Sequence, residues 1–497
     1  MTKGEVRNMR SDRSWRRGWG LRALVLVVGL LAWFAESVAA ERAWDAYRYQ
    51  GAEHYEGYGP IEEQLEVNNP PVPTPVGRRL LREYIPGVAE EMRKWPAFFR
   101  DLSLNLHFRS YYFNRELPFR PPPPSGPDNF NQEAWALGGW VGVQSGWLLD
   151  TFRAGAVGYT TQPAYAPADR DGTGLLGPGQ TGFAVVGQAY GQLKYQEYAL
   201  LTGGRYLVNQ GFVNPQDNRM IPNTFEGASL SGVFGPVEYY AGYLTAMKTR
   251  TADSFANMAA VAGVTTGENR GMAITTLNFD PAAGPAALST LAGLQIFVGN
   301  YFVPDVFNTL YLNPEYRRPL NDDWRIGFGV QFLDQQSVRQ QLRGSFSTWH
   351  VGARAELGWR GLTFLAMMSV TGPNSGVLAP YGGWVGYISL IETDFNLANE
   401  KAWETGFTYD WGGTTFKNFK IPGLWTSILY AEGFDIRAQA QNVPVGKRRE
   451  ADLFTVWRLP QVPGMQFRFL ASMIQQEPQT RLFYDFRIIL DLEIPLF

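Results

Sequence analysis

The 497-residue chain contains no cysteine and only three histidines, His54, His107 and His350. Without cysteine, neither disulfides nor thiolate chemistry can operate. The scattered histidines form no cluster of metal-ligand spacing, and they give no serine triad of the kind that a lipid-cleaving barrel enzyme needs. The sequence therefore predicts a protein that is not an enzyme and that holds no metal or other cofactor.

Long apolar runs and strong charge are also missing. The longest apolar run, Ala23 to Ala35, is too short to span a bilayer as a helix, and mean hydropathy is only -0.21. Charged residues make up 18% of the chain, without a basic patch for nucleic acid. What the chain has instead is 54 glycines and 14% aromatic residues, a composition rich in turns and strand formers.

The apolar run follows a basic segment and ends at Val38-Ala39-Ala40, a small-residue cleavage pattern. Residues 1–40 are therefore predicted to be a secretory signal peptide, cleaved before Glu41. The alternative is an uncleaved anchor. The mature chain would be acidic, with 37 Lys and Arg against 43 Asp and Glu and a net charge of -6.

The last stretch, Arg481 to Phe497, alternates between apolar and polar residues with a period of two. Ile488, Leu490 and Leu492 fall on one face, while Arg487 and Asp491 fall on the other. A long strand with one apolar and one charged face is typical of a strand between lipid and an aqueous lumen. The alternative is an edge strand of a soluble sandwich, and Pro495 predicts a bulge near the chain end.

The same alternation recurs from Leu102 onward, and it gives nineteen candidate strands. An up-and-down barrel with both ends on one side needs an even number, so at least one candidate is not a wall strand. Trp residues recur at strand ends, as in the aromatic girdles of membrane barrels. Short and long connections alternate, which predicts short turns in the periplasm and long loops outside.

Three stretches carry a family resemblance: Asn105 to Arg115, Asn218 to Ala228, and Glu400 to Trp403 with Tyr409-Asp410 and Ile421 to Leu424. From about Leu102 to Phe497 the chain resembles the OprD family of substrate-specific outer-membrane porins. The resemblance implies an all-β transmembrane barrel of about 18 antiparallel strands in the outer membrane of a Gram-negative bacterium. It also implies inward-folded loops, and uptake of small carboxylate-bearing solutes along a row of basic side chains. The chain departs from the family at Asn223 and Glu226, where Gln and Arg are usual.

Glu41 to Asp101 differs from the barrel region, Leu102 to Phe497, and has no evident counterpart in the family. A Pro-rich linker precedes Gly77 to Trp95, where apolar residues recur at helical spacing, interrupted by Pro86. We expect an extension with a short helix, packed at the rim of the barrel. Two alternatives are a partial plug and a periplasmic docking arm.

Basic side chains on the inner faces of strands are the candidate site, because a charge beside a narrow path acts more strongly than one in bulk water. Arg219 is a separate candidate, since it lies in a segment without strand periodicity, which predicts either a constriction or an ordinary surface loop. A further alternative is that Arg and Glu on neighbouring strands only neutralise each other. The candidates on strands are Arg109, Lys194, Arg325, Arg354, Arg468 and Arg487.

The predicted function is diffusion or uptake of small solutes through a loop-constricted lumen. The alternatives are a channel for apolar solutes plugged by the extension, and a structural or adhesion barrel. The expected partners are outer-membrane lipid, small solutes, and the barrel-assembly machinery, which would recognise Phe497. The pore is expected to be a monomer or a homotrimer, with no nucleic-acid partner.

Overall fold

The computed structural model describes residues 86–92, 94–118, 129–196, 198–412, 419–437, 446–462 and 464–495. The expected signal peptide at 1–40, residues 41–85 of the extension, His54 and Phe497 lie outside the described residues.

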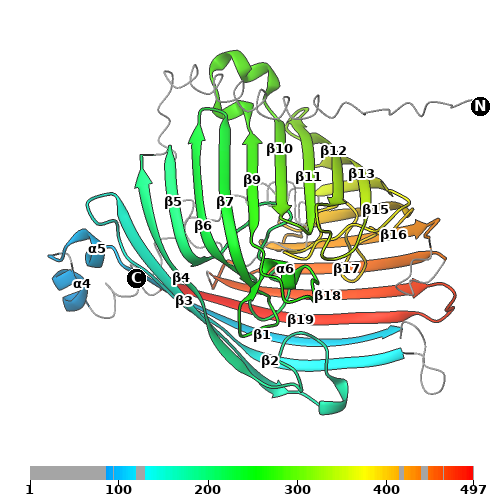
Figure 1. Ribbon diagram of the computed structural model, residues 1–497, viewed down its shortest axis with the longest axis horizontal. Coiled ribbons are helices and arrows are strands. Elements are labelled where there is room, and N and C mark those ends of the chain that lie inside the picture. Colours follow the sequence, from blue (N-terminus) through cyan, green and yellow to red (C-terminus); the bar gives the residue numbers. More distant parts are fainter. Residues whose placement is uncertain are drawn as a thin grey trace, which may run out of the picture.

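One antiparallel sheet closes on itself through the pairing of its first and last strands (Figure 1). The sheet has nineteen strands, of which β8 (Ala256–Asn257) has two residues and pairs only with the end of β7; the other eighteen form the wall. This confirms the predicted barrel of about 18 strands and identifies the strand that is not part of the wall. The wall strands are β1 (Ser103–Pro118), β2 (Asn129–Gln144), β3 (Phe152–Tyr165), β4 (Phe183–Tyr195), β5 (Ala199–Tyr206), β6 (Thr224–Phe234), β7 (Val237–Lys248), β9 (Met272–Phe279), β10 (Leu294–Val303), β11 (Phe307–Pro319), β12 (Trp324–Ser337), β13 (Ser347–Trp359), β14 (Leu362–Thr371), β15 (Lys401–Asp410), β16 (Leu424–Phe434), β17 (Arg448–Arg458), β18 (Met465–Gln476) and β19 (Phe483–Pro495).

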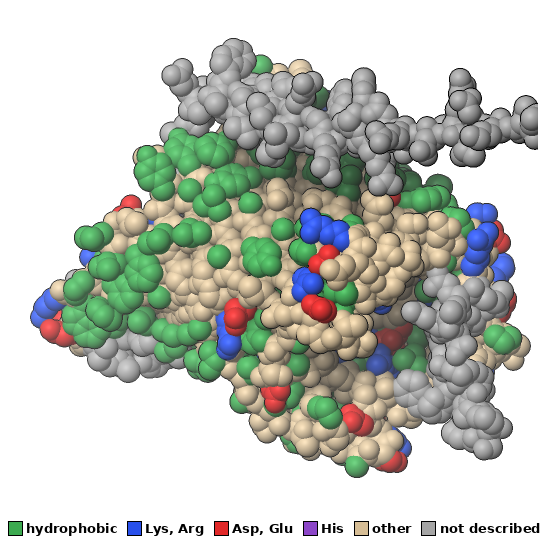
Figure 2. Space-filling view, viewed as in Figure 1, with side chains coloured by type: hydrophobic (Ala, Val, Ile, Leu, Met, Phe, Trp, Pro, Cys, Tyr) green, Lys and Arg blue, Asp and Glu red, His purple; other side chains and the backbone are tan. Residues whose placement is uncertain are grey.

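The two faces of the wall differ as the alternation predicts. On β12, Phe328 and Val330 are about half exposed, at 52% and 50%, whereas Gln331 between Val330 and Phe332 is 1% exposed. Figure 2 shows apolar side chains spread over the outside of the wall with few charged side chains among them. An apolar outside and a polar inside are the arrangement that lipid imposes on a barrel.

The closing pair, β1 and β19, is in continuous register from Asn105 opposite Pro495 to Glu116 opposite Tyr484. The bulge predicted near Pro495 is therefore wrong for the described part of this pair. Proline at the end of a strand needs no bulge, because its missing N–H lies where the ladder stops.

The helices of the described chain are short. They are α4 (Pro86–Met92), α5 (Ala97–Arg100), η2 (Ala168–Arg170), α6 (Met258–Val261), η3 (Pro281–Ala283) and η4 (Ala286–Leu291). None of the helices in the described ranges is long and apolar enough to cross a membrane. α4 begins at Pro86, since proline suits the first turn of a helix. α5 lies against the β2–β3 turn, where Gly146 donates to the carbonyl of Phe98 at 2.9 Å.

Three long connections fold into the lumen, and their apolar side chains form the interior packing with inward-facing residues of the wall. We name them by their residues: segment 166–182, segment 207–223 and segment 372–400. Leu175, Met220 and Ile388 of these segments are all at most 1% exposed. They enter from the end of the barrel opposite to α5 and the last described residues of β19, so the lumen is narrowed from its long-loop side (Figure 1).

Candidate functional site

Segment 207–223 is fixed to the wall by an ion pair in the middle of β1. The guanidinium of Arg109 donates to both oxygens of Asp217 at 2.8 Å and to the backbone carbonyl of Arg219 at 2.6 Å. It also donates to Asp491 on β19, at 2.6 Å. Arg109 is fully buried and its charge is compensated, so it acts as the anchor of this segment.

Further along the same face of β1 lies a group of guanidiniums that we call the arginine cluster: Arg115, Arg219, Arg250 and Arg487. The guanidinium carbons of Arg115, Arg219 and Arg487 lie 5.1, 4.9 and 4.6 Å from the centre of the Phe113 ring. Each separation allows a cation–π interaction. One aromatic ring therefore gathers positive charges from β1, β19 and segment 207–223.

Glu392 of segment 372–400 joins two members of the cluster. Nη1 of Arg115 donates to both of its carboxylate oxygens at 2.9 Å, and Nη2 of Arg487 donates to Oε1 at 2.8 Å. Burial alone would raise the pKa of Glu392, but the charges of Arg115 and Arg487 outweigh it and bring the pKa to about 2. Glu392 is thus ionised at every physiological pH.

Segment 372–400 is held in place by main-chain donors. The amide of Glu392 donates to Glu450 and that of Ile391 to Asp452, both at 2.8 Å. Because these two acceptors lie on β17, the wall determines where along the barrel axis Glu392 contacts the arginines.

Arg219 and Arg250 have a different environment. Arg219 donates to the carbonyl of Asn218 at 2.7 Å, Nη1 of Arg250 is buried without a hydrogen-bond partner, and neither guanidinium forms an ion pair with any described residue. Burial and the nearby charge of Arg487 lower the pKa of Arg219 to about 10. Burial and the charge of Arg219 lower the pKa of Arg250 to about 9. Both remain charged at neutral pH, and Glu392 acts on both of them without forming an ion pair with either, so these two arginines present positive charge that is only partly compensated.

Two more of the sequence candidates are compensated by carboxylates on the wall. Arg354 pairs with Glu315 at 2.9 Å and with Glu356 at 3.0 Å. Arg468 donates to Asp491 at 2.7 Å. The alternative interpretation, that basic and acidic groups on neighbouring strands neutralise each other, describes both residues.

The remaining two candidates lie at the short-turn end of the barrel, away from the cluster. Lys194 pairs with Asp150 of the β2–β3 turn at 2.6 Å, and its ammonium lies 4.5 Å from the centre of the Trp147 ring. Arg325 donates to the carbonyl of Arg360 and to Thr363, both at 2.8 Å. These two charges are placed at the periplasmic mouth rather than at the constriction.

Sequence reasoning missed Arg115, Arg250 and Glu392 as members of the site, whereas Asp217 is among the polar residues that made segment 207–223 a candidate constriction. Arg115 lies six residues after Arg109 on β1, and side chains an even number of residues apart on a strand share a face. The alternation therefore predicts that Arg115 also faces the lumen. Glu392, Asp217 and Arg250 lie in connections, where no periodicity indicates which side chains point into the lumen. A contact between residues far apart in the chain leaves no local pattern in the sequence.

The two family departures have separate structural roles. Asn223 is buried, donates to the carbonyl of Asn214 at 3.2 Å and accepts a hydrogen bond from the amide of Arg250 at 2.7 Å. It therefore positions the start of the connection that carries Arg250. Glu226 is about 40% exposed and pairs with Arg205 at 2.8 Å, outside the cluster. Within the described residues there is no group of three or more metal-ligating side chains that could hold an ion.

A closed barrel with an apolar outside and a charged lumen narrowed by its own connections is a transmembrane channel. Residues 96–496 match the family described as outer membrane porin, OprD family. The chain belongs to this family, and its place is the outer membrane of Gram-negative bacteria. Proteins of this family are porins that pass small solutes.

Individual relatives are distant in sequence. Porin D of Pseudomonas aeruginosa is 24% identical over 360 residues, which cover 68% of this chain and 75% of that protein. The crystal structure of Pseudomonas aeruginosa OccK9 (OpdG) has a TM-score of 0.68 at 21% identity, and that of OpdK with vanillate from the same species has 0.65 at 19%; each covers 80% of this chain and all of the solved chain. Acinetobacter baumannii OccAB2 has a TM-score of 0.68 at 19% identity and covers 81% of this chain and all of its own. At these identities the solved structures establish the fold alone.

Proposed function

We propose that this porin takes up small carboxylate-bearing solutes, and that the arginine cluster is the place where the carboxylate is recognised. The observation that carries the proposal is the pair Arg219, which is buried, and Arg250, which is half-buried with an enclosed Nη1; neither forms an ion pair with a described residue. A buried charge without a partner is unfavourable, and an anion that enters beside it relieves that cost.

The attraction between a lumen arginine and an anionic solute is large enough to make the channel prefer anions to cations. At about 4 Å and an effective dielectric near 20, the attraction between two unit charges is about 4 kcal/mol before desolvation of the solute is subtracted. Even a remainder of about 1.4 kcal/mol changes occupancy about tenfold. Two guanidiniums that are only partly compensated therefore suffice to favour anions over cations.

The shape of the guanidinium favours a carboxylate over a spherical anion. Its planar donors match two carboxylate oxygens at once. The pair formed by Arg109 and Asp217, with two hydrogen bonds of 2.8 Å from separate nitrogens to separate oxygens, is an internal example of this geometry. A solute carboxylate can take the same position on Arg219 or Arg250. The OpdK relative, whose crystal structure holds vanillate, a carboxylate, supports this solute class.

In this proposal the basic residues have different roles along the solute's path through the lumen. Arg219 and Arg250 meet the solute, and Arg115 and Arg487 hold Glu392 beside them. Arg109, Arg354 and Arg468 hold carboxylates of the wall and the connections. Lys194 and Arg325 add positive charge at the periplasmic mouth. The charged lumen opposes the alternative of a channel for apolar solutes, and the proposal includes no enzymatic step.

Swelling of proteoliposomes tests the proposal. Vesicles that contain the porin are placed in isotonic solutions of benzoate, of benzylamine as the cation of similar size, or of neutral benzamide. We expect benzoate to enter fastest, and we expect a variant with Arg219→Gln and Arg250→Gln to lose most of that advantage. Arg318→Gln is the matched control, because it removes the same charge at an exposed position of β11. Equal entry of benzoate and benzylamine into wild-type vesicles would overturn the proposal.

A further inference from the structure

The inner wall carries a second recessed site that contains no charged group. It lies on β4, β5, β6 and β7, under the first residues of segment 207–223, and has a volume of about 90 Å³. A cavity needs about 10 to 15 Å³ to hold one water, so this one accommodates several waters or one small polar group. We call it the tyrosine pocket.

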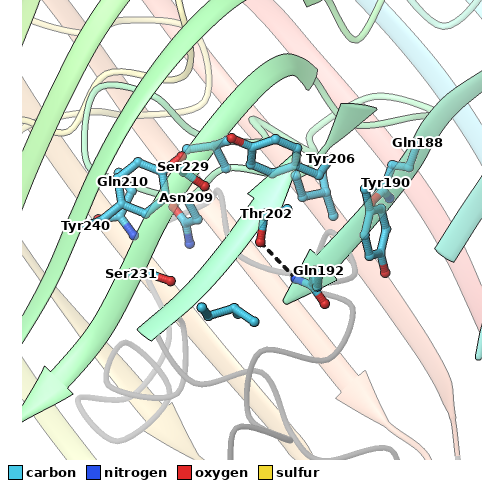
Figure 3. A pocket seen from close by; sticks show the side chains of 13 residues that line it. Gln188, Tyr190, Gln192, Thr202, Tyr206, Asn209, Gln210, Ser229, Ser231 and Tyr240 are labelled. Atoms are coloured by element: carbon cyan, nitrogen blue, oxygen red, sulfur yellow. Dashed lines mark hydrogen bonds between the residues drawn. The ribbon is translucent and has the colours of Figure 1, made fainter. Parts of the chain in front are cut away.

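The lining of the tyrosine pocket consists of hydroxyls, amides and aromatic rings together with Leu200, Leu207 and Val208. In Figure 3, Tyr206, Asn209, Ser229 and Tyr240 gather on one side of it, and Gln188, Tyr190 and Gln192 lie on the other. No Asp, Glu, Lys, Arg or His lines it. Such a lining offers hydrogen bonds without selecting for charge.

The hydroxyls of Tyr206 and Tyr240 are buried but do not form a well-formed hydrogen bond. Tyr206 and Tyr240 are 6% and 7% exposed, and neither hydroxyl has a described partner at hydrogen-bonding distance and angle, although the two hydroxyls lie near each other and near Ser229. Buried hydroxyls nearly always have partners, because leaving one unsatisfied costs folding free energy. By contrast, the amides around them are engaged: Gln192 donates to Thr202 at 3.1 Å, and Gln188 donates to Tyr159 at 2.6 Å.

The tyrosine pocket lies closer to the periplasmic end of the barrel than the arginine cluster does, so a solute that enters from outside reaches the cluster first. Arg115 lies near the long-loop end of β1, whereas Tyr240 is near the short-turn end of β7. Short turns face the periplasm in barrels of this kind. A solute that enters from outside thus meets charge first and uncharged hydroxyls second.

We propose that the tyrosine pocket is a binding subsite for a neutral, hydroxyl-bearing group, and that the porin favours polyhydroxylated carboxylates over plain ones. The inference rests on the proposed function, since the arginine cluster supplies the carboxylate recognition. Hydroxyls of the solute form full hydrogen bonds with Tyr206 and Tyr240, which an alkyl chain cannot do. A site built to bond hydroxyls rejects an analogue that lacks them.

Saturation of single-channel conductance tests this inference with two six-carbon monoanions, gluconate and hexanoate. We expect wild type to half-saturate at a lower concentration of sodium gluconate than of sodium hexanoate. Tyr206→Phe and Tyr240→Phe keep the rings, and each should raise the half-saturating gluconate concentration about five-fold, the worth of one hydrogen bond, without changing that of hexanoate. The control is Tyr243→Phe on the same strand, whose side chain is 50% exposed on the outer face and which should change neither value.

The outcomes separate the subsite from the proposed function. A porin that prefers anions to cations but binds gluconate and hexanoate equally overturns the subsite alone. An unchanged gluconate value in both Tyr→Phe variants also overturns the subsite alone. A wild-type porin that prefers cations overturns the proposed function and the subsite together.

Discussion

Arg109 on β1 and Asp217 in segment 207–223 are joined by two parallel hydrogen bonds of 2.8 Å, across 108 residues of chain. Both side chains are buried. The wall strand therefore determines where the segment that carries Arg219 lies in the lumen. Since removing one partner of a buried ion pair costs about 3 to 5 kcal/mol, this contact is strong enough to keep the lumen narrow.

The first prediction follows from that contact. Asp217→Asn leaves Arg109 paired with Asp491 but releases segment 207–223 from β1. We expect a higher single-channel conductance in KCl and a lower thermal stability, because the segment no longer holds the constriction. Asp253→Asn, at an exposed position of another connection, is the control. Unchanged conductance and stability in Asp217→Asn would show that the ion pair does not set the width of the lumen.

A second prediction concerns the cost of an unpaired charge. Arg219→Gln should raise the stability of the folded barrel by about 1 to 3 kcal/mol, because a buried guanidinium without an ion pair is removed. The same change should lower anion preference. Thermal unfolding in detergent measures the first effect and reversal potentials the second. Arg318→Gln, an exposed arginine, should do neither. A destabilised Arg219→Gln with wild-type selectivity would mean that Arg219 is only structural.

The third prediction is a pH dependence. The pKa of Glu392 is about 2 in the folded protein, below its ordinary value near 4.3. A lowered carboxyl pKa contributes stability that is fully present above about pH 4.3 and is lost as pH falls toward 2. Wild type should therefore be more stable than Glu392→Gln at pH 7, and the difference should shrink between about pH 4 and pH 2. A difference that stays constant down to pH 2 would contradict the ion pairs with Arg115 and Arg487.

The fourth prediction concerns assembly. β19 closes the barrel against β1, and an unpaired edge in lipid is strongly unfavourable. We propose that the terminal aromatic residue, Phe497, helps the assembly machinery to place this strand. Deletion of Phe497 should lower the heat-modifiable, folded fraction in outer membranes, whereas Phe497→Tyr, which keeps the ring, should not. Equal folded yield from the deletion and from wild type would remove this role.

The wall was predictable from the sequence because a barrel strand records its two environments residue by residue. Phe328 and Val330 alternate with Gly329 and Gln331 for that reason, and the alternation predicted both the strand and its faces. The bulge near Pro495 was a wrong prediction, since a rule for strand interiors was applied to a strand end.

The site was predictable only where it is part of the wall. Parity nominated Arg487, which belongs to the cluster, but it also nominated Arg354, which neighbouring carboxylates compensate. Whether an inward charge is compensated depends on side chains from other strands and from inward segments. Glu392 reaches Arg115 from 277 residues away, and no local pattern predicts such a contact.

Our central proposal is that Arg219 and Arg250 make the lumen selective for anions, and reversal potentials across a planar bilayer under a KCl gradient are its sharpest test. We predict that wild type prefers chloride to potassium, that Arg219→Gln with Arg250→Gln reduces the permeability ratio several-fold, and that the exposed Arg318→Gln leaves it nearly unchanged. The effect should persist in high salt, because charges at a constriction are screened less than exposed ones. A wild-type ratio near one, or the same loss in Arg318→Gln as in the double variant, would refute this proposal.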